Sequence, residues 1–393
     1  MSHIFQPQVN NKKDNIFRVK LPFHLLGDNT SENKNTIIFW GADFKFLPPG
    51  IPEDKFIELS NSCLDFIRKN CPGYELIYKL HPAETDEYTK LNLDGFSVVG
   101  TDNIGEFYLL KNINRIKYTF SAISGACVSA HKMGIPSYVF VSLFEPLFRP
   151  ETLKGYREYF SQLPSESFIS NFADGFRDYK TAVDIDETLK NNFVRLLKES
   201  PGKVFFIADT PGSLAELISL TKLIKSISPQ RPVGLLVCRH HRWDVMNFDD
   251  LKAHFDSIDI FSRTFYSLRP NKLIKALKIA RDIKKFPIKN GDILIGTTHT
   301  SFVEVCFMSY HKHAKMLCVL SEVSFDTVYG QRGKKMLAEI HYETPPSSHF
   351  YNLIFEPLLG LYRTKYMNDP GKVMNFRCYQ EPVNDIYDQI YLI

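Results

Sequence analysis

The sequence predicts an α/β protein in which helices cover parallel sheets, arranged as two Rossmann-like domains. Strand-like apolar runs alternate with helix-like segments along the whole chain. The 393 residues exceed what one ordinary hydrophobic core accommodates. A Pro-Gly-Lys break at 201–203 separates two complete strand–helix series. We therefore expect one domain over residues 1–200 and a second over residues 201–393.

The first half contains the first series. We expect strands at 36–42, 74–80, 96–100, 115–121 and 136–142, and helices at 53–70, 103–113 and 124–134. The first of these helices is the clearest, because Phe56, Leu64 and Ile67 share one side. The remainder of this half is less regular and ends in a helix-like stretch before the break.

The second half repeats the pattern. We expect strands at 203–209, 233–238, 292–296 and 314–322, and helices at 213–227 and 270–286. Ligands in such folds bind outside the carboxyl ends of the strands. Two Rossmann-like domains facing one another would therefore form a binding cleft.

Composition and charge narrow the function classes. Apolar residues make up 44% and charged residues 23%, as in ordinary globular proteins. The net charge of +4 is too weak to indicate a nucleic-acid partner, but it suits an anionic substrate or an acidic membrane surface.

The cysteines and the N-terminal residues indicate the cellular compartment in which the protein is expected. The seven cysteines are scattered, and none forms a Cys-x-x-Cys pair. Buried free thiols in a reducing compartment are the simplest interpretation, and a zinc site is not expected. The start has no apolar signal-peptide core, and no run approaches the roughly 20 apolar residues of a membrane span. We expect a cytoplasmic protein that contacts a membrane at most peripherally.

The stretch "YKLHPAE" (78–84) is the first candidate motif. Proline removes a backbone donor and disfavours the α region for the preceding residue, so His81 is expected at the abrupt end of an extended segment. Lys79 and His81 could meet a phosphate there, and His81 could donate a proton to a departing one. The alternative is a surface histidine before a turn proline.

The second motif is "YTFSAISGACVSAHKMGIP" (118–136), a strand followed by a small-residue helix. Ser121, Ser124 and Gly125 fall at the turn between them. A helix N-terminus offers free N–H groups and a positive dipole end, which suit a phosphate. The alternative is an N-cap serine on a tightly packed helix.

These two motifs in this order resemble the nucleotide half of the bacterial CMP-sugar transferases, over residues 36–142. That family comprises sialyl-, polysialyl- and Kdo transferases of capsule and lipooligosaccharide synthesis. The resemblance implies a GT-B-like fold of two Rossmann-like domains and a CMP-linked ulosonic acid as donor. It implies donor-binding roles for Lys79, His81, Pro82, Ser121, Ser124 and Gly125.

The order of the domains departs from that family, which places its acceptor half first. Here only about 35 residues precede the nucleotide half. "KVFFIADTPGSLAELISL" resembles the family's opening strand and helix, and "AKMLCVLSEVSFDTVYG" resembles the strand with its acidic motif. We therefore expect a circularly permuted order. Ser321-Glu322-Val323 stands where the family has two acids and a glycine.

Four acidic residues are candidates for the acceptor side or for catalysis. Glu322 would be the general base that takes a proton from an acceptor hydroxyl, or else a solvated strand-end acid. Asp326 could replace it. Asp43 follows the first strand, and retaining Kdo transferases use an aspartate at a comparable loop as nucleophile. Asp209 is an acceptor-side candidate, with helix capping in "DTPGS" as the favoured alternative.

Basic residues complete the set. Arg239 and His241, in "CRHHRWD", could bind the acceptor or the sugar carboxylate, and His299 lies in a polar turn after a strand. Residues 274–286 form a basic amphipathic helix. Its polar side is by default a solvated face, and the alternative is contact with an anionic membrane.

The sequence thus predicts a glycosyltransferase that moves sialic acid from CMP-sialic acid to a glycan or glycolipid acceptor. We expect no metal, no cofactor and no nucleic-acid partner, with peripheral contact at the inner membrane. A CMP-Kdo transferase is the first alternative. Another nucleotide-sugar transferase or an epimerase on the same scaffold is the second, and a binding module for a polyanionic glycan is the non-enzyme alternative.

Overall fold

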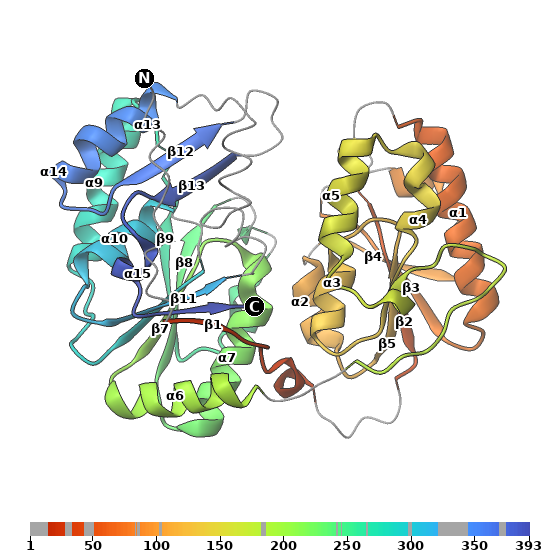
Figure 1. The fold of residues 1–393 in the computed structure, drawn as a ribbon, viewed down its shortest axis with the longest axis horizontal. Coiled ribbons are helices and arrows are strands. Elements are labelled where there is room, and N and C mark those ends of the chain that lie inside the picture. The colour runs from red at the N-terminus through yellow and green to blue at the C-terminus, as the bar shows by residue number, and fades with distance from the viewer. Residues whose placement is uncertain are drawn as a thin grey trace. The chain divides into compact units, whose positions relative to one another are not determined.

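The computed structural model describes residues 15–27, 34–42, 51–82, 84, 87–101, 104–181, 186–240, 243–244, 246–264, 266–297, 301–320, 345–368 and 375–393. The chain divides into two compact units. The first contains the described residues of 22–184 together with 214–219, and the second contains the others. Each unit is built on a parallel sheet, so the predicted fold class of two Rossmann-like domains is confirmed (Figure 1).

The first unit has a five-stranded parallel sheet in the order β4-β3-β2-β5-β6. Its strands are β2 (Thr36–Trp40), β3 (Glu75–Lys79), β4 (Phe96–Val99), β5 (Ile116–Ser121) and β6 (Ser137–Val139). Its helices are α1 (Glu53–Asn70), α2 (Gly105–Asn112), α3 (Ala126–Lys132), α4 (Val141–Phe144) and α5 (Pro150–Phe160). Helices α2 and α3 cover one face and α1 the other, so β2 is buried along its whole length (Figure 1).

The second unit has a seven-stranded parallel sheet in the order β1-β14-β11-β10-β7-β8-β9. Its strands are β1 (Ile16–Arg18), β7 (Val204–Ala208), β8 (Val233–Arg239), β9 (Ser257–Ser262), β10 (Ile293–Gly296), β11 (Lys315–Leu320) and β14 (Gln389–Leu392). An antiparallel hairpin, β12 (Thr364–Asn368) and β13 (Asn375–Tyr379), stands apart from this sheet.

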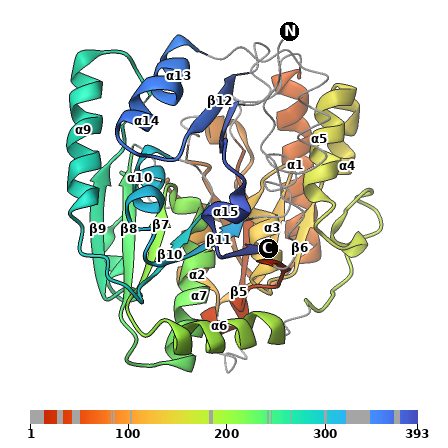
Figure 2. The same ribbon diagram turned by 60° about the vertical axis from the view of Figure 1, so that its left-hand side comes forward.

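The helices of this unit are α6 (Glu187–Glu199), the part of α7 (Leu214–Ile227) that follows residue 219, α8 (Phe248–Leu251), α9 (Pro270–Lys284), α10 (Phe302–Tyr310), α13 (Pro346–Phe350), α14 (Glu356–Leu358) and α15 (Val383–Ile386). Helices α9 and α10 pack side by side on one face of the sheet (Figure 2). The core beneath them is apolar and includes Ile207, Leu236, Leu294, Ile279 and Phe307. Among the described helices, none combines the length and hydrophobicity that a membrane span needs.

The division between the units differs from the expected boundary at residue 201. Strand β1 pairs in parallel with β14, placing Ile16 opposite Ile390, so the N-terminal segment belongs to the second unit. Helix α6 belongs there too, because Phe193 packs on Tyr391 with ring centroids 5.7 Å apart. A strand contributed from nearly 375 residues away leaves no local signal in the sequence.

The expectation of buried free thiols is confirmed for all seven cysteines. Burial raises the pKa of Cys71, Cys127 and Cys378 to about 12, so these thiols stay protonated and unreactive near neutral pH.

A buried guanidinium joins the end of α6 to the start of β7. Arg231 donates to the carbonyl oxygens of Ser200 at 2.8 Å, Gly202 at 2.6 Å and Leu197 at 2.6 Å. The Leu197 carbonyl belongs to the last turn of the helix, and the Ser200 and Gly202 carbonyls lie between the helix and the strand. The side chain therefore satisfies backbone groups that are left over at the end of α6 and before β7.

Replacing Arg231 by methionine should lower the free energy of unfolding by about 2–4 kcal/mol, because buried carbonyls lose their donors while the apolar stem is kept. Urea unfolding followed by circular dichroism measures this. The exposed Arg195 of α6 is the control, and Arg195→Met should change stability by no more than about 0.5 kcal/mol. Equal effects of the two changes would contradict the role given to Arg231.

Candidate active site

The carboxyl ends of three neighbouring strands lie in register in the first unit. Trp40, the last residue of β2, pairs with Lys79 of β3 on one side and Ser121 of β5 on the other. The order of the strands along the chain reverses between β2 and β5, and doubly wound sheets bind ligands at such a switch point. Both predicted motifs therefore end at one edge of one sheet.

A tight turn fixes the backbone of His81. The N–H of Glu84 donates to the carbonyl of His81 at 2.8 Å, and the N–H of His81 donates to Oε2 of Glu84 at 3.0 Å. Pro82 lies exposed within this turn, and the His81 side chain is partly exposed. The turn therefore presents the imidazole just beyond the end of β3, as the sequence predicts.

Glu84 holds this turn from inside the fold. Its side chain is only 3% exposed, and Oε1 accepts a hydrogen bond from the hydroxyl of Tyr78 at 2.8 Å. A Cβ atom on Gly41 would collide with Oε2 of Glu84, so only glycine allows the carboxylate to sit against the end of β2. Sequence reasoning did not select Glu84, although its spacing in Lys-x-His-Pro-x-Glu was the available signal.

Lys79 is buried and bound within the fold. Its ammonium donates to the carbonyls of Leu80 at 3.1 Å and Gly100 at 2.6 Å, and lies 5.9 Å from the ring centroid of Tyr108. These bonds tie the end of β3 to the end of β4. The ammonium therefore places a positive charge beneath the predicted site, and it already donates hydrogen bonds to two backbone carbonyl oxygens.

The serine turn shapes the neighbouring strand end. The hydroxyl of the buried Ser121 accepts from the N–H of Ser124 at 3.1 Å, which closes the turn after β5. The hydroxyl of the partly exposed Ser124 accepts from the N–H of Ala126 at 3.3 Å. Ser121 therefore acts on backbone geometry, and Ser124 is the serine that reaches the surface of the site.

Gly125 accommodates the close approach of a tyrosine side chain. Its φ of −62° is open to any residue, but a Cβ atom there would lie 2.5 Å from the hydroxyl of Tyr159 on α5. The glycine therefore lets a tyrosine hydroxyl reach the start of α3. Sequence reasoning predicted the glycine and did not select Tyr159.

Trp40 leaves a polar atom without a partner at the switch point. Its side chain is buried, packs edge-on against Tyr108 at 6.4 Å and approaches Gly105. Within the part of the chain that the structure describes, its indole Nε1 has no hydrogen-bond partner. Buried donors normally have one, so this N–H is a candidate donor to a bound ligand.

The second unit has its own switch point, between β7 and β10, and Asp209 follows β7 there. The carboxylate is buried, with Oδ2 3.9 Å from a guanidinium nitrogen of Arg263. Its Oδ1 has no hydrogen-bond partner among the described residues. The Asp209 carbonyl accepts from Nε2 of His240 at 2.7 Å and Nε1 of Trp243 at 3.1 Å, which holds the segment after β8 against it.

The described contacts of Asp209 are not those of a helix cap. The N-cap of α7 is Ser213, and no side chain caps this helix. The Ser213 hydroxyl instead donates to the carbonyl of Thr210 at 3.0 Å. The favoured alternative for Asp209, helix capping in "DTPGS", is therefore not the arrangement seen.

The remaining predicted residues fall into two groups. Arg239 is exposed at the end of β8, 3.3 Å from the carboxylate of Asp244 and 6.0 Å from the ring centroid of Phe248. Asp43, His241, His299, Glu322 and Asp326 lie outside the described residues. Among the described residues, no three histidine, cysteine or carboxylate side chains form a group that could hold a metal ion.

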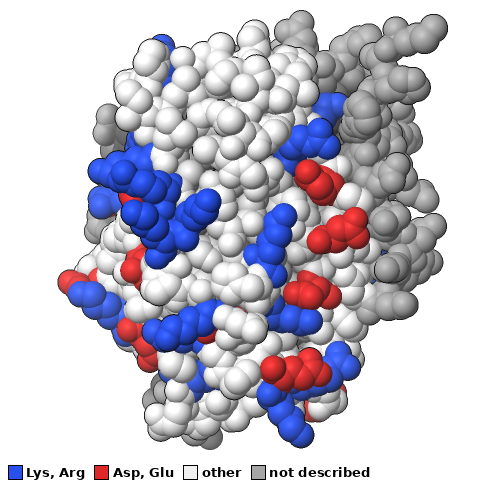
Figure 3. Space-filling model, turned by 90° about the vertical axis from the view of Figure 1, so that its left-hand side faces the viewer, with Lys and Arg blue, Asp and Glu red and all other residues white. Residues whose placement is uncertain are grey.

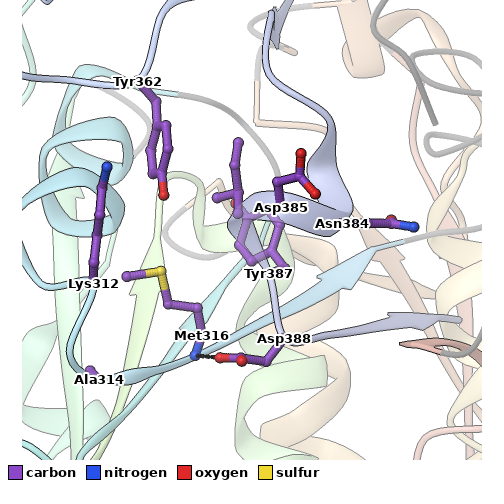
Figure 4. A pocket seen from close by; sticks show the side chains of 9 residues that line it. Lys312, Ala314, Met316, Tyr362, Asn384, Asp385, Tyr387 and Asp388 are labelled. Atoms are coloured by element: carbon purple, nitrogen blue, oxygen red, sulfur yellow. Dashed lines mark hydrogen bonds between the residues drawn. The ribbon is translucent and has the colours of Figure 1, made fainter. Parts of the chain in front are cut away.

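A polar pocket of about 290 Å³ lies at the other end of the second sheet (Figure 4). It is lined by residues that precede or begin β11 and β14, including Lys312, Met316, Asp385 and Asp388, and by Tyr362, which precedes β12. Asp388 accepts from the N–H of Met316 at 2.8 Å, and the ammonium of Lys312 lies 4.1 Å from the ring centroid of Tyr362. This is the amino edge of the strands, opposite the edge that holds Asp209.

Comparison with known proteins identifies no family. No protein-family description matches the chain, and no curated protein does. One similar solved structure is that of the wall teichoic acid polymerase TagF, which is 13% identical, with 79% of this chain and 75% of that chain covered and a TM-score of 0.19. A TM-score this low does not indicate that the two chains share an overall fold, so no activity is inferred for this protein from the similarity.

The Tyr78–Glu84 contact predicts a pH dependence. Burial, reinforced by the Glu84 carboxylate, raises the pKa of Tyr78 well above its usual value of 10.0. The unfolded chain releases this proton first, so the stabilisation is complete below about pH 10 and is lost as pH rises from there toward the folded pKa. Tyr78→Phe should make the fall of unfolding free energy above pH 10 shallower, by up to about 1.4 kcal/mol per pH unit. Chemical denaturation from pH 9 to 11 measures both slopes, and parallel curves would contradict this assignment.

Proposed function

We propose that this protein is a glycosyltransferase that uses a CMP-activated ulosonic acid, with sialic acid as the first candidate. One observation carries the proposal. The His-Pro turn and the serine turn end on adjacent sides of β2, at the switch point of a Rossmann-like sheet. Phosphate-bearing ligands bind at this position in such folds. The specific choice of CMP and sialic acid rests on the resemblance of the two motifs to the CMP-sugar transferases.

In this proposal the exposed groups of the two turns contact the donor phosphate. His81 donates a hydrogen bond, and then a proton, to the phosphate oxygen that leaves with CMP. Ser124 and the backbone at Gly125 bind another phosphate oxygen, and the Trp40 indole N–H is a further donor at the same edge. The proposed chemistry places charge stabilisation on these groups and calls for no metal or other cofactor.

In this proposal Lys79 has a supporting role, whereas the sequence predicted that it would contact the phosphate directly. Its ammonium is bound to two backbone carbonyls, so it supports the strand end and contributes positive potential from below the site. Pro82 and Glu84 act similarly on His81, by fixing the turn that presents it.

The acceptor side is proposed for the second unit, in the reversed domain order. Asp209 is buried after β7, and its Oδ1 has no hydrogen-bond partner among the described residues, with Arg263 nearby. It could orient an acceptor hydroxyl, with Glu322 as the base that deprotonates it. Asp43 acting as a nucleophile would instead give retention of configuration. Arg239, His241 and His299 are proposed acceptor contacts.

The alternative functions differ in which sugar donor is used and in whether the protein catalyses a reaction at all. A CMP-Kdo transferase or another nucleotide-sugar transferase would use the same strand ends with a different sugar. A glycan-binding module would bind polyanions through its basic residues without releasing nucleotide. Incubation with CMP-sialic acid, CMP-Kdo and UDP-sugars, followed by detection of free nucleotide, separates these options. We propose a cytoplasmic location, where nucleotide-activated donors would be supplied.

His81→Ala should lower the rate of CMP release by about 30- to 1,000-fold, because one positioned donor is lost from the transition state. Ser124→Ala should mainly weaken CMP binding, measured by calorimetry. His254, at the amino edge of the second sheet, gives the matched control, and His254→Ala should leave both quantities unchanged. Unaltered kinetics and binding in the His81 and Ser124 variants would remove the donor site from this edge.

Three isosteric changes distinguish the acidic candidates. Glu322→Gln should slow transfer by about 10²–10⁴-fold with CMP affinity kept, as expected for loss of a general base. Asp209→Asn should mainly raise the KM for acceptor. If Asp43→Asn abolishes transfer while Glu322→Gln does not, a covalent retaining mechanism replaces the one proposed.

A further inference from the structure

One helical segment of the second unit turns apolar side chains outward. Residues 346–358 run continuously through α13, the π-helical turn Tyr351–Phe355 and α14. Leu353, Ile354 and Leu358 are 65%, 56% and 78% exposed, and Tyr351 and Phe355 point into the core. Exposed leucines are ordinary when scattered, but these three lie on one helix face.

The same segment keeps its acidic group inside. Glu356 is fully buried and accepts from the N–H and the hydroxyl of Thr364, both at 2.8 Å, with the Arg377 guanidinium 3.9 Å away. The segment contains no lysine, arginine or aspartate. Its exposed face therefore carries aliphatic groups, with the exposed His349 as its titratable side chain.

The segment that leads into α9, together with the first turns of that helix, extends this apolar surface. Tyr351 contacts the segment directly, since its hydroxyl donates to the carbonyl of Ser267 at 3.4 Å and its ring lies 4.7 Å from that of Tyr266. Just beyond, Leu268 is exposed and Ile274 is 66% exposed. We call Leu268, Ile274, Leu353, Ile354 and Leu358 the apolar cap.

Basic side chains continue from the cap along α9. Lys278, Arg281 and Lys285 follow Ile274 at intervals of four, seven and eleven residues, so they share its exposed helix face. Asp282 pairs with Arg281 at 3.6 Å and is the one acidic residue within α9. Figure 3 shows this side of the protein, where lysine and arginine side chains gather below a broad uncharged area.

We propose that the apolar cap and the basic side of α9 together bind the surface of an anionic membrane. Aliphatic side chains would enter the region between head groups and acyl chains, and the basic side chains would meet acidic head groups. A second copy of the chain fits less well, because a two-fold contact would set the basic row of one copy beside that of the other. This surface contains none of the residues proposed to bind the donor. The membrane-binding proposal can therefore be tested independently of the glycosyltransferase proposal.

Vesicle sedimentation with the full-length protein tests the proposal. Wild type should sediment with phosphatidylglycerol vesicles at low salt, should be partly released by 0.5 M NaCl, and should not sediment with phosphatidylcholine vesicles. Leu353→Ser, Ile354→Ser and Leu358→Ser combined should lower binding to phosphatidylglycerol at least about 10-fold. Lys278→Glu, Arg281→Glu and Lys285→Glu combined should do the same and remove the salt dependence, since each basic group near an anionic surface contributes substantially to binding.

Substitutions on α6 serve as controls. They remove a similar positive charge, or an exposed apolar side chain, at a place outside the proposed membrane-binding surface. Lys190→Glu, Arg195→Glu and Lys198→Glu combined, and Val194→Ser alone, alter residues of the same unit that are exposed, or partly exposed in the case of Lys190, and should leave vesicle binding unchanged. Circular dichroism and thermal melts establish that each variant is folded. Wild type that fails to bind phosphatidylglycerol, or cap variants that bind as wild type does, overturn the proposal. So does a wild-type dimer that the cap variants convert to monomer without any vesicle binding.

Discussion

The parallel pairing of β2 with both β3 and β5 is the constraint on which the candidate site depends. Because Trp40 lies opposite Lys79 and Ser121 at the same time, the loops that follow three strands begin at one level. Two motifs that are 40 residues apart in the chain are thereby brought to one edge. A shift of one residue in either pairing would move the strand ends and turn their side chains to the opposite faces.

Buried polar groups then decide which side chains remain available at that edge. Glu84 is occupied by the Tyr78 hydroxyl and the His81 amide, Lys79 by carbonyls, and Ser121 by the turn that it closes. Burying any of these groups without a hydrogen-bond partner would be costly in free energy. Each of them forms a hydrogen bond with a backbone group of the turn or strand end that it holds in place. Among the polar donor-site candidates Lys79, His81, Ser121 and Ser124, it is His81 and Ser124 that keep partly exposed side chains.

The second unit repeats the topology with different chemistry at its switch point. An acidic side chain, Asp209, follows β7 at this switch point, where the first unit has Gly41 after β2. The Asp209 carbonyl is bound by His240 and Trp243, so the segment after β8 is anchored to the end of β7. One unit thus presents hydrogen-bond donors and the other a carboxylate, a difference that suits a division between a phosphate-bearing donor and a hydroxyl-bearing acceptor.

The sequence by itself determined most of the strands and helices of the two Rossmann-like series, because hydrophobic periodicity and Gly/Pro punctuation are local properties, but it did not predict strand β9 or helix α10. It also placed His81 beyond a strand end, since proline acts on its immediate neighbour. Only the tertiary structure decided that β1 joins β14, that Lys79 is buried against Gly100, and that Glu84 rather than a surface group holds the His81 turn. It likewise decided that Leu353 and Leu358 face outward. Pairing between distant segments and the direction in which a helix turns its apolar residues depend on what packs beside them, and that information is not contained in any local stretch of the chain.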